Sequence, residues 1–101
     1  MAKERRRLAP IHPGEILLEE FMKPMGISIN KLARELCVPP GRISAIVNGK
    51  RSISADTALR LGTYFGVSAD LWVGLQADYD LRVAERAVGA EIARRVRPHV
   101  A

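Results

Sequence analysis

The sequence predicts an all-α protein, folded as one domain from five to six short helices. Of its 101 residues, 48% are hydrophobic, which is enough to bury one modest core. Leu, Ile, Val and Ala carry the apolar content, whereas aromatic residues make up only 5%, a balance that suits helices packed on helices. Apolar residues recur at helical spacing, and no segment alternates between apolar and polar residues as a half-buried strand would.

The first helix is predicted to begin at Pro13, after an extended basic arm over residues 1–12. Proline suits the first helical position, and the carboxylate of Glu15 in the first turn is favoured by the helix dipole. Pro24 and Gly26 are expected to end this helix, because neither residue is favourable in a helix interior.

A second helix is predicted over residues 28–37, because Ser28 is a good N-cap. The chain then turns sharply, and the Pro39-Pro40 pair begins a third helix. Asn48-Gly49 should end it, since both residues tolerate a left-handed backbone conformation. The apolar residues predicted to face inward from these two helices are Ile29, Leu32, Ala33, Leu36, Ile43, Ile46 and Val47.

A fourth helix is expected to begin after Ser54 and to end at Gly66, with Ala58, Leu61 and Phe65 on its inner face. Ser68 should cap a short fifth helix that carries Leu71, Trp72 and Leu75. A last helix is predicted from about residue 77 to about residue 96, just before Pro98.

The charge balance is basic. Sixteen Lys and Arg residues against eleven Asp and Glu residues give a formal net charge of +5. This excess favours a polyanionic partner, because every phosphate that a cation neutralises releases counterions from the nucleic acid. The alternative is a charge that serves solubility alone.

The sequence argues against several other classes of protein. Cys37 is the single cysteine, so there is neither an intramolecular disulfide nor a thiolate cluster for zinc, and we expect no metal and no cofactor. The basic start of the chain lacks the apolar stretch of a signal peptide, and no run approaches the roughly 18 apolar residues that span a bilayer. We therefore expect a cytoplasmic protein with no membrane partner.

The most informative stretch is residues 27–61, where two short helices are joined by a tight turn. A helix-turn-helix requires a small residue such as Ala33 on the first helix, so that the second can cross it closely. It also requires an apolar anchor such as Val38 in the turn. The outer face of the second helix is then free to enter a DNA major groove about 12 Å wide.

Three segments of this stretch resemble the lambda-repressor-like, XRE-type helix-turn-helix family: SINKLA (residues 28–33), VPPGRIS (38–44) and IVNGKR (46–51). Three further segments resemble the HigA branch of antitoxins: HPGEIL (12–17), ISADTALRL (53–61) and LWVGLQADYDL (71–81). The resemblance covers about residues 12–81. It implies a lambda-repressor-like bundle with a basic arm (1–12), a DNA-binding domain (13–76) and a C-terminal helix and tail (77–101).

The resemblance also implies that the outer face of the third helix reads bases. Pro40, Gly41 and Ala45 occupy positions that often carry base-reading polar side chains, and none of them can form a bidentate hydrogen bond. Ala45 can still touch a thymine methyl, Gly41 permits close backbone approach, and Arg42 is the one long donor for a guanine edge. Direct readout is therefore expected to be modest, with DNA shape and phosphate contacts supplying more of the affinity.

The side chains expected to contact phosphates flank this helix on both sides. Each has a structural alternative: Ser28 is a helix cap in any case, Asn48 is a helix terminator, and Lys31 with Arg34 is an ordinary solvent-facing surface. A basic run at residues 5–7 is either an arm that enters a minor groove or a solubilising end. The phosphate candidates are Ser28, Asn30, Lys31, Ser44, Asn48, Lys50, Arg51 and Ser52.

Two protein partners are expected. The resemblance implies a homodimer with contacts at Trp72, Leu75, Tyr79 and Leu81, although Trp72 could instead fill the monomer core. Toxins of the HigB or RelE-like type tend to be basic, so Glu15, Glu19 and Glu20 form a candidate toxin-facing patch, with a plain solvent face as the alternative.

These observations predict a type II antitoxin that neutralises a HigB/RelE-like mRNA-cleaving toxin and represses its own operon by binding double-stranded operator DNA as a dimer. One alternative is a stand-alone XRE-family repressor with no toxin partner. Another is a helix-turn-helix scaffold that has lost DNA binding and binds only protein. An enzyme is not expected, because no nucleophile–base arrangement, Gly-rich phosphate loop or paired carboxylate site is present.

Overall fold

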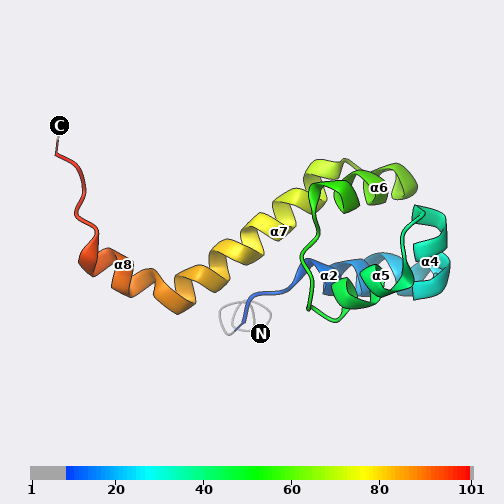
Figure 1. The fold of residues 1–101 in the computed structure, drawn as a ribbon, viewed down its shortest axis with the longest axis horizontal. Coiled ribbons are helices and arrows are strands. Elements are labelled where there is room, and N and C mark those ends of the chain that lie inside the picture. Colours follow the sequence, from blue (N-terminus) through cyan, green and yellow to red (C-terminus); the bar gives the residue numbers. More distant parts are fainter. Residues whose placement is uncertain (1–8, 101) are drawn as a thin grey trace.

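The computed structural model describes residues 9–100, and this part of the chain folds into five continuous helices without a strand (Figure 1). The first helix comprises α2 (Pro13–Ile16), η1 (Leu17–Met22) and α3 (Lys23–Met25). Next come α4 (Ile29–Leu36), α5 (Pro40–Val47) and α6 (Ala55–Phe65). The last helix comprises α7 (Ala69–Ala84), η2 (Glu85–Gly89) and α8 (Ala90–Arg95). The all-α, lambda-repressor-like fold class predicted from the sequence is confirmed.

The first helix begins at Pro13 as expected, but Pro24 does not end it. The chain leaves the helix only at Gly26, whose φ of 65° is left-handed. A proline inside an α-helix lacks the N–H and crowds the carbonyl four residues earlier. Here the preceding turns are π-helical, with the Lys23 N–H bonded to the Leu18 carbonyl, and this wider winding gives the proline ring room.

The turn between α4 and α5 is sharp because Cys37 adopts a left-handed conformation, with a φ of 60°. The Cys37 N–H then bonds to the Arg34 carbonyl at 3.2 Å, and the Val38 N–H bonds to the Ala33 carbonyl at 3.0 Å. This pair of bonds is a Schellman motif, which satisfies carbonyls at the end of α4. Val38, 9% exposed, turns inward and anchors the turn, as the sequence predicted.

The helix caps predicted from serine residues are present. The Ser28 hydroxyl accepts a hydrogen bond from the Lys31 N–H at 3.1 Å, Ser54 accepts one from the Thr57 N–H at 3.2 Å, and Ser68 caps α7. Gly66 ends α6 with a φ of 73°. These local signals fix where α4, α6 and α7 begin.

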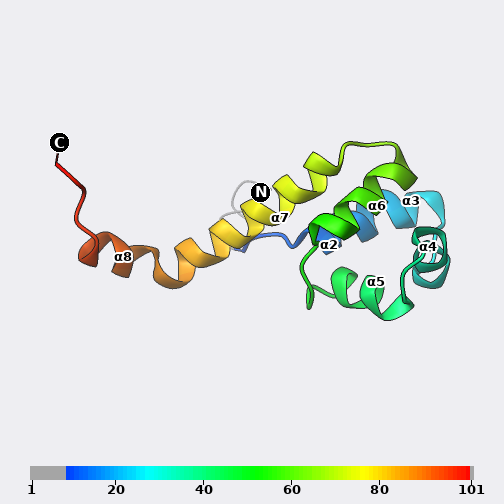
Figure 2. The same cartoon turned by 45° about the horizontal axis from the view of Figure 1, so that its top comes forward.

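The prediction of a short fifth helix followed by a separate last helix is wrong. One helix runs without interruption from Ala69 to Arg95, so the expected boundary between residues 76 and 77 falls inside α7. Gly74 is the only helix-breaking residue type before η2, and a single glycine weakens a helix without ending it. Figure 2 shows the second half of this helix projecting away from the other helices.

The core lies between the first helix, α4, α5, α6 and the start of α7. Leu17, Leu32, Ile43, Ile46 and Leu61 have no exposed surface, and neither do the two small residues that allow close helix crossing, Ala33 and Ala58. Beyond residue 80, every described residue except Gly89 is exposed, so the projecting half of the last helix has no core of its own. None of the described helices combines the length and the apolar character that crossing a membrane would require.

Candidate nucleic-acid interface

The two helices of the helix-turn-helix, α4 and α5, pack directly on one another through Ala33, Ile43 and Ile46, which are all fully buried. Burial of this inner face leaves the opposite face of α5 open. Gly41 and Asn48 are exposed there, and Ser44 and Ala45 are half-buried. These four positions follow helical spacing, so they form one small-residue surface over which a polyanion backbone or a base edge can approach closely.

Asn48 takes part in ending α5. Its Nδ2 donates to the Ser44 carbonyl at 2.9 Å, and the left-handed conformation belongs to Gly49, with a φ of 74°, and not to Asn48. The Gly49 N–H bonds to the Ile46 carbonyl at 3.0 Å, and the Lys50 N–H bonds to the Ala45 carbonyl at 2.8 Å. This Schellman motif turns the chain out of α5 and into the loop of Lys50, Arg51 and Ser52.

The phosphate candidates lie at the two ends of this surface. Lys50, Arg51 and Ser52 are all exposed in the loop after α5. On the other side, Ser28, Asn30 and Lys31 are exposed at the start of α4, where the helix dipole favours an anion. Both groups of donors are therefore free of the core and exposed, as phosphate contacts require.

Arg42 does not extend over this face. Its side chain is 24% exposed, and its Nη1 donates to Asp56 Oδ2 on α6 at 2.8 Å. Arg60 Nε binds the same carboxylate oxygen at 2.9 Å, and Arg60 Nη1 also donates to the Leu36 carbonyl at 2.9 Å. The two guanidinium groups hold the pKa of the Asp56 carboxyl below its ordinary value, Arg60 more strongly than Arg42. Arg42 thus ties α5 to α6, a role that sequence reasoning missed.

The residues expected at a dimer interface separate into two groups. Trp72 has no exposed surface and packs on Phe21 with ring centroids 5.0 Å apart, so the core interpretation of this residue is correct and the interface interpretation is wrong. A fully buried side chain has no surface left for a partner. Leu75 and Tyr79 are half-buried, and Leu81 is 52% exposed.

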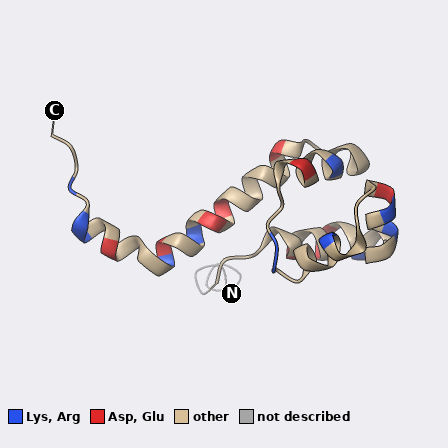
Figure 3. Cartoon of the chain, in the orientation of Figure 1, with Lys and Arg blue, Asp and Glu red and all other residues tan. Residues whose placement is uncertain are grey.

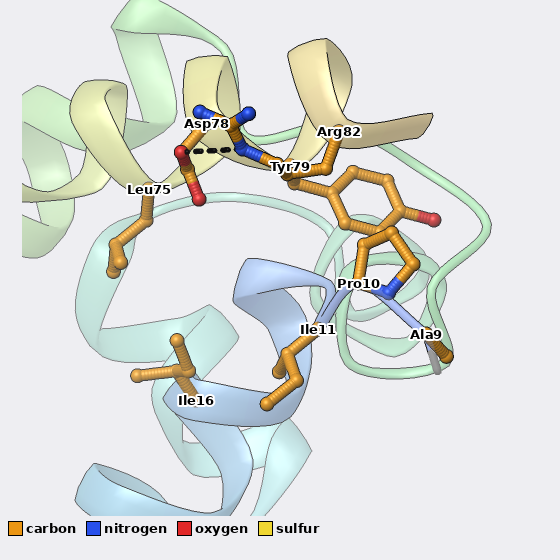
Figure 4. A pocket seen from close by; sticks show the side chains of 8 residues that line it. All are labelled: Ala9, Pro10, Ile11, Ile16, Leu75, Asp78, Tyr79 and Arg82. Atoms are coloured by element: carbon orange, nitrogen blue, oxygen red, sulfur yellow. Dashed lines mark hydrogen bonds and ion pairs between the residues drawn. The ribbon is translucent and has the colours of Figure 1, made fainter. Parts of the chain in front are cut away.

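Leu75 and Tyr79 line a surface groove between the chain before α2 and the face of α7 (Figure 4). The volume of this groove is about 350 Å³. Tyr79 also packs edge-on against the ring of His12, with centroids 4.9 Å apart. In Figure 4 the Pro10 ring lies beside Tyr79, and Arg82 is bound to Asp78 at the rim. The groove residues are Ala9, Pro10, Ile11, Ile16, Leu75, Asp78, Tyr79 and Arg82.

The acidic residues of the first helix are exposed at Glu15, Glu19 and Glu20, as a patch requires. Glu19 is paired with Lys23 at 2.8 Å, which reduces the negative field of the patch. Figure 3 shows that acidic and basic residues also occur together along the projecting helix. The basic run at residues 5–7 lies outside the described residues.

Sequence reasoning missed three residues that support the loop after α5. His12, Gly14 and Gln76 contact the backbone of this loop or of the end of α5. The available signal was the HPG sequence at residues 12–14, together with a glutamine on the inner side of α7. The roles of these three residues can be assigned only from the tertiary structure, because their partners are distant in the sequence. In the described part of the chain, no group of His, Cys, Asp or Glu residues is arranged to hold a metal ion.

Comparison with known proteins agrees with this geometry. A family model described as helix-turn-helix matches residues 18–72. The chain is 52% identical over 82 residues to virulence-associated protein I of Dichelobacter nodosus. The aligned segment covers 81% of this chain and 76% of that protein. These matches place the helix-turn-helix where the structure has α4 and α5.

Two solved structures extend the likeness over the whole fold. An addiction module antidote protein of a HigA family from Coxiella burnetii has a TM-score of 0.86 and 47% identity, covering 90% of this chain and 99% of that one. The antitoxin HigA of Pseudomonas aeruginosa, solved with the higBA promoter, has a TM-score of 0.88 and 46% identity, with the same coverage of each chain. The family comprises regulators and not enzymes. The chain belongs to the HigA family of helix-turn-helix antitoxins.

Proposed function

We propose that this antitoxin binds operator DNA of its own promoter as a homodimer and neutralises a HigB/RelE-like, mRNA-cleaving toxin. The observation that carries the DNA part is the small-residue face of α5, flanked by two groups of exposed donors. The P. aeruginosa relative, which shares the fold at a TM-score of 0.88, was solved with a promoter. Family membership and local geometry therefore support the same surface.

Within this surface, the two ends hold phosphates and the middle approaches bases. Gly41, Ser44, Ala45 and Asn48 offer one exposed amide, one hydroxyl and otherwise only backbone and methyl groups. Because Arg42 is held by Asp56, the readout of base edges is weak, and DNA shape and deformability supply much of the discrimination. The phosphate contacts come from Ser28, Asn30, Lys31, Lys50, Arg51 and Ser52.

The DNA assignment is tested with Lys50→Ala. Losing one phosphate contact should weaken binding to all DNA sequences about equally and make the slope of log K against log salt shallower by about one unit. The matched control is Arg95→Ala, which removes one positive charge from an ion pair on the distant α8. Binding measured by fluorescence anisotropy between about 50 and 200 mM salt gives both slopes. An unchanged slope for Lys50→Ala would refute the phosphate contact.

The homodimer is proposed from the groove beside α7 and from the exposed apolar side chains beyond it on the same helix. One helix-turn-helix reads a single half-site, and two copies about one helical turn apart read a palindrome. Leu75 and Tyr79 line the groove, Leu81 is 52% exposed further along α7, and the second half of the last helix projects away from the other helices (Figure 2), where a second copy can reach it.

The toxin partner is proposed from family membership and from the exposed carboxylates of Glu15, Glu19 and Glu20. The test is co-purification of this chain with the product of the neighbouring open reading frame, followed by a gel shift with the promoter fragment. A stable complex that still shifts the DNA supports an antitoxin that also represses. A specific shift without any partner supports the alternative, a stand-alone repressor, and makes the acidic patch ordinary surface.

A further inference from the structure

His12 joins three parts of the molecule that are distant in sequence. Its Nδ1 accepts a hydrogen bond from the Gly14 N–H at 2.9 Å and so caps α2. The ring also lies next to Gly49 at the end of α5 and packs against Tyr79 of α7, and an interaction with the Arg51 backbone partly offsets the lowering of its pKa by burial. One neutral imidazole thus connects α2, the loop after α5 and α7.

Gln76 holds the far end of the same loop. It is 6% exposed, and its Oε1 accepts a hydrogen bond from the Ile53 N–H at 2.8 Å. Its Nε2 donates to Asp80 Oδ1 at 3.0 Å, one turn further along α7. Both polar ends of this buried amide are therefore satisfied, and its orientation is fixed.

Close packing at the start of α2 brings His12 into place. A Cβ atom on Gly14 would overlap the carbonyl oxygen of Ile46 near the end of α5, so only glycine allows the two helix ends to approach this closely. Pro13, the first residue of α2, is also buried in this contact region. The HPG sequence therefore docks the start of α2 against the end of the helix that faces DNA.

We propose that His12 and Gln76 are positioning residues for DNA binding, which hold the Lys50–Ser52 loop in the geometry that meets the phosphate backbone. Neither side chain needs to touch DNA. His12 packs against the start of the loop at Gly49 and Gln76 fixes its end at Ile53, so the cations at residues 50 and 51 are ordered before the DNA arrives. Ordering a loop in advance removes part of the entropic cost of association. This inference rests on the proposed DNA-binding function of the same loop.

The decisive variant is His12→Asn. The Asn side chain can accept the Gly14 N–H as an N-cap, so the start of α2 is preserved. The shorter side chain loses the contacts that the imidazole ring makes with Gly49 and Tyr79, so the loop loses this support. We expect the thermal midpoint to stay close to that of the wild type, while affinity for a promoter duplex falls by about three- to tenfold. The matched control is Ser68→Asn, a cap exchange at α7 that should leave affinity unchanged.

A double-mutant cycle separates positioning from a general structural effect. If His12 acts through the loop, its replacement should cost little affinity when Lys50 and Arg51 are already alanine, and the two effects should not add. If His12→Asn lowers affinity by the same factor in both backgrounds, the proposal is overturned. This comparison remains valid even if the thermal midpoint of His12→Asn is lowered, because both backgrounds share that loss.

The wild type and Lys50→Ala show which of the two proposals has failed. A wild type that does not bind the promoter duplex overturns the proposed function and this inference with it. If the wild type binds, Lys50→Ala changes the salt slope and His12→Asn binds like the wild type, the loop contacts DNA but His12 does not position it. Only the positioning proposal is then overturned.

Discussion

Cys37 occupies the turn of the helix-turn-helix in a conformation that glycine adopts more easily. Its φ of 60° makes it the single non-glycine residue with a positive φ in the described chain. A side chain in the left-handed region costs roughly 1–2 kcal/mol, and part of this is offset because glycine loses more backbone entropy on folding. The turn of the helix-turn-helix is therefore held under mild backbone strain at Cys37.

We therefore predict that Cys37→Gly raises the free energy of unfolding by up to about 1 kcal/mol, because it relieves this strain. Denaturant unfolding of the two proteins measures the difference. Cys37→Ala serves as the control, since it removes the thiol and keeps the Cβ atom that causes the strain, and it should be near neutral. A Cys37→Gly protein less stable than Cys37→Ala would contradict the prediction, because it would show that the backbone entropy glycine loses on folding outweighs the relief of strain.

His12 makes stability depend on pH. Burial lowers its pKa below the ordinary value of 6.5, and the negative charge of Asp80 and the hydrogen bond with Arg51 only partly offset this effect. The folded state therefore favours the neutral ring more than the unfolded state does. The resulting stability is fully present above pH 6.5 and is lost as the pH falls from there to the lower pKa of the folded state.

The expected result is that the wild type loses more stability between pH 7.5 and about pH 5.5 than His12→Asn does. Protonation of Nδ1 would also remove the acceptor of the Gly14 N–H, which acts in the same direction. Urea midpoints of both proteins at the two pH values test this, and taking the difference cancels carboxylate effects common to both. If the two proteins show the same pH dependence, protonation of His12 does not contribute to the pH dependence of the free energy of unfolding in this range.

At the scale of the helices, a cluster of charged side chains joins α5 to α6. Asp56 in the first turn of α6 receives Arg42 from α5 and Arg60 from its own helix, and Arg60 continues to the end of α4 at the Leu36 carbonyl. Sequence reasoning predicted a different role for Arg42, because a long donor near the start of a recognition helix is typical of a base contact. Its partner is 14 residues away and only the packed helices bring it close.

Arg42→Ala should accordingly weaken DNA binding by a similar factor for every operator variant, because α5 loses a tie to α6 and no base contact is removed. Affinity for a promoter duplex and for a set of single G·C to A·T substitutions measures this. If Arg42 instead leaves Asp56 to read a guanine, the variant will lose its discrimination at one base pair, worth about 1–3 kcal/mol, and keep it at all the others.

The last helix is one continuous element where the sequence predicted two. From the sequence, Leu71, Trp72 and Leu75 were predicted to lie on a short helix after Ser68, and a separate helix was expected from about residue 77. The structure contains one helix in which η2 (residues 85–89) is π-helical, so the face of the helix shifts without a break. The first part packs on α6, whereas the described side chains of the second part are almost all exposed.

At the scale of the whole molecule, the projecting part of the last helix carries exposed apolar side chains at Leu81, Val88 and Ile92, which are between 41% and 52% exposed. We predict that Leu81→Glu shifts a homodimer toward monomer and weakens operator binding, because a carboxylate on an apolar contact surface costs desolvation. Sedimentation and promoter binding test the two effects. Val100→Glu adds the same charge at the 87% exposed end of the chain and should change neither.

A Leu81→Glu protein that keeps the association state of the wild type would exclude this part of α7 from the interface. Because Leu81 has few contacts within the monomer, its replacement should leave the thermal midpoint of the monomer nearly unchanged. Loss of folding would contradict that expectation and would assign Leu81 to the monomer core, as the structure does for Trp72.

The sequence by itself determined the helices that begin and end on local signals. Ser28, Ser54 and Ser68 cap helices, Gly26, Gly49 and Gly66 end them, and helical spacing of apolar residues identified the core face of α4 and α5. These features depend on interactions within a few residues, so they can be inferred without the fold. The positions of Lys50, Arg51 and Ser52 after the recognition helix follow from the same local reasoning.

Tertiary structure alone decided what the long side chains and the buried polar groups do. Arg42 is bound to Asp56, Trp72 fills the core, and His12 and Gln76 hold the loop after α5 from 39 and 23 residues away. It also decided that residues 69–95 form one helix. The physical reason is the same in each case: the partner is brought near by packing of other helices, and neither charge nor hydropathy along the chain encodes which of several possible partners that packing will supply.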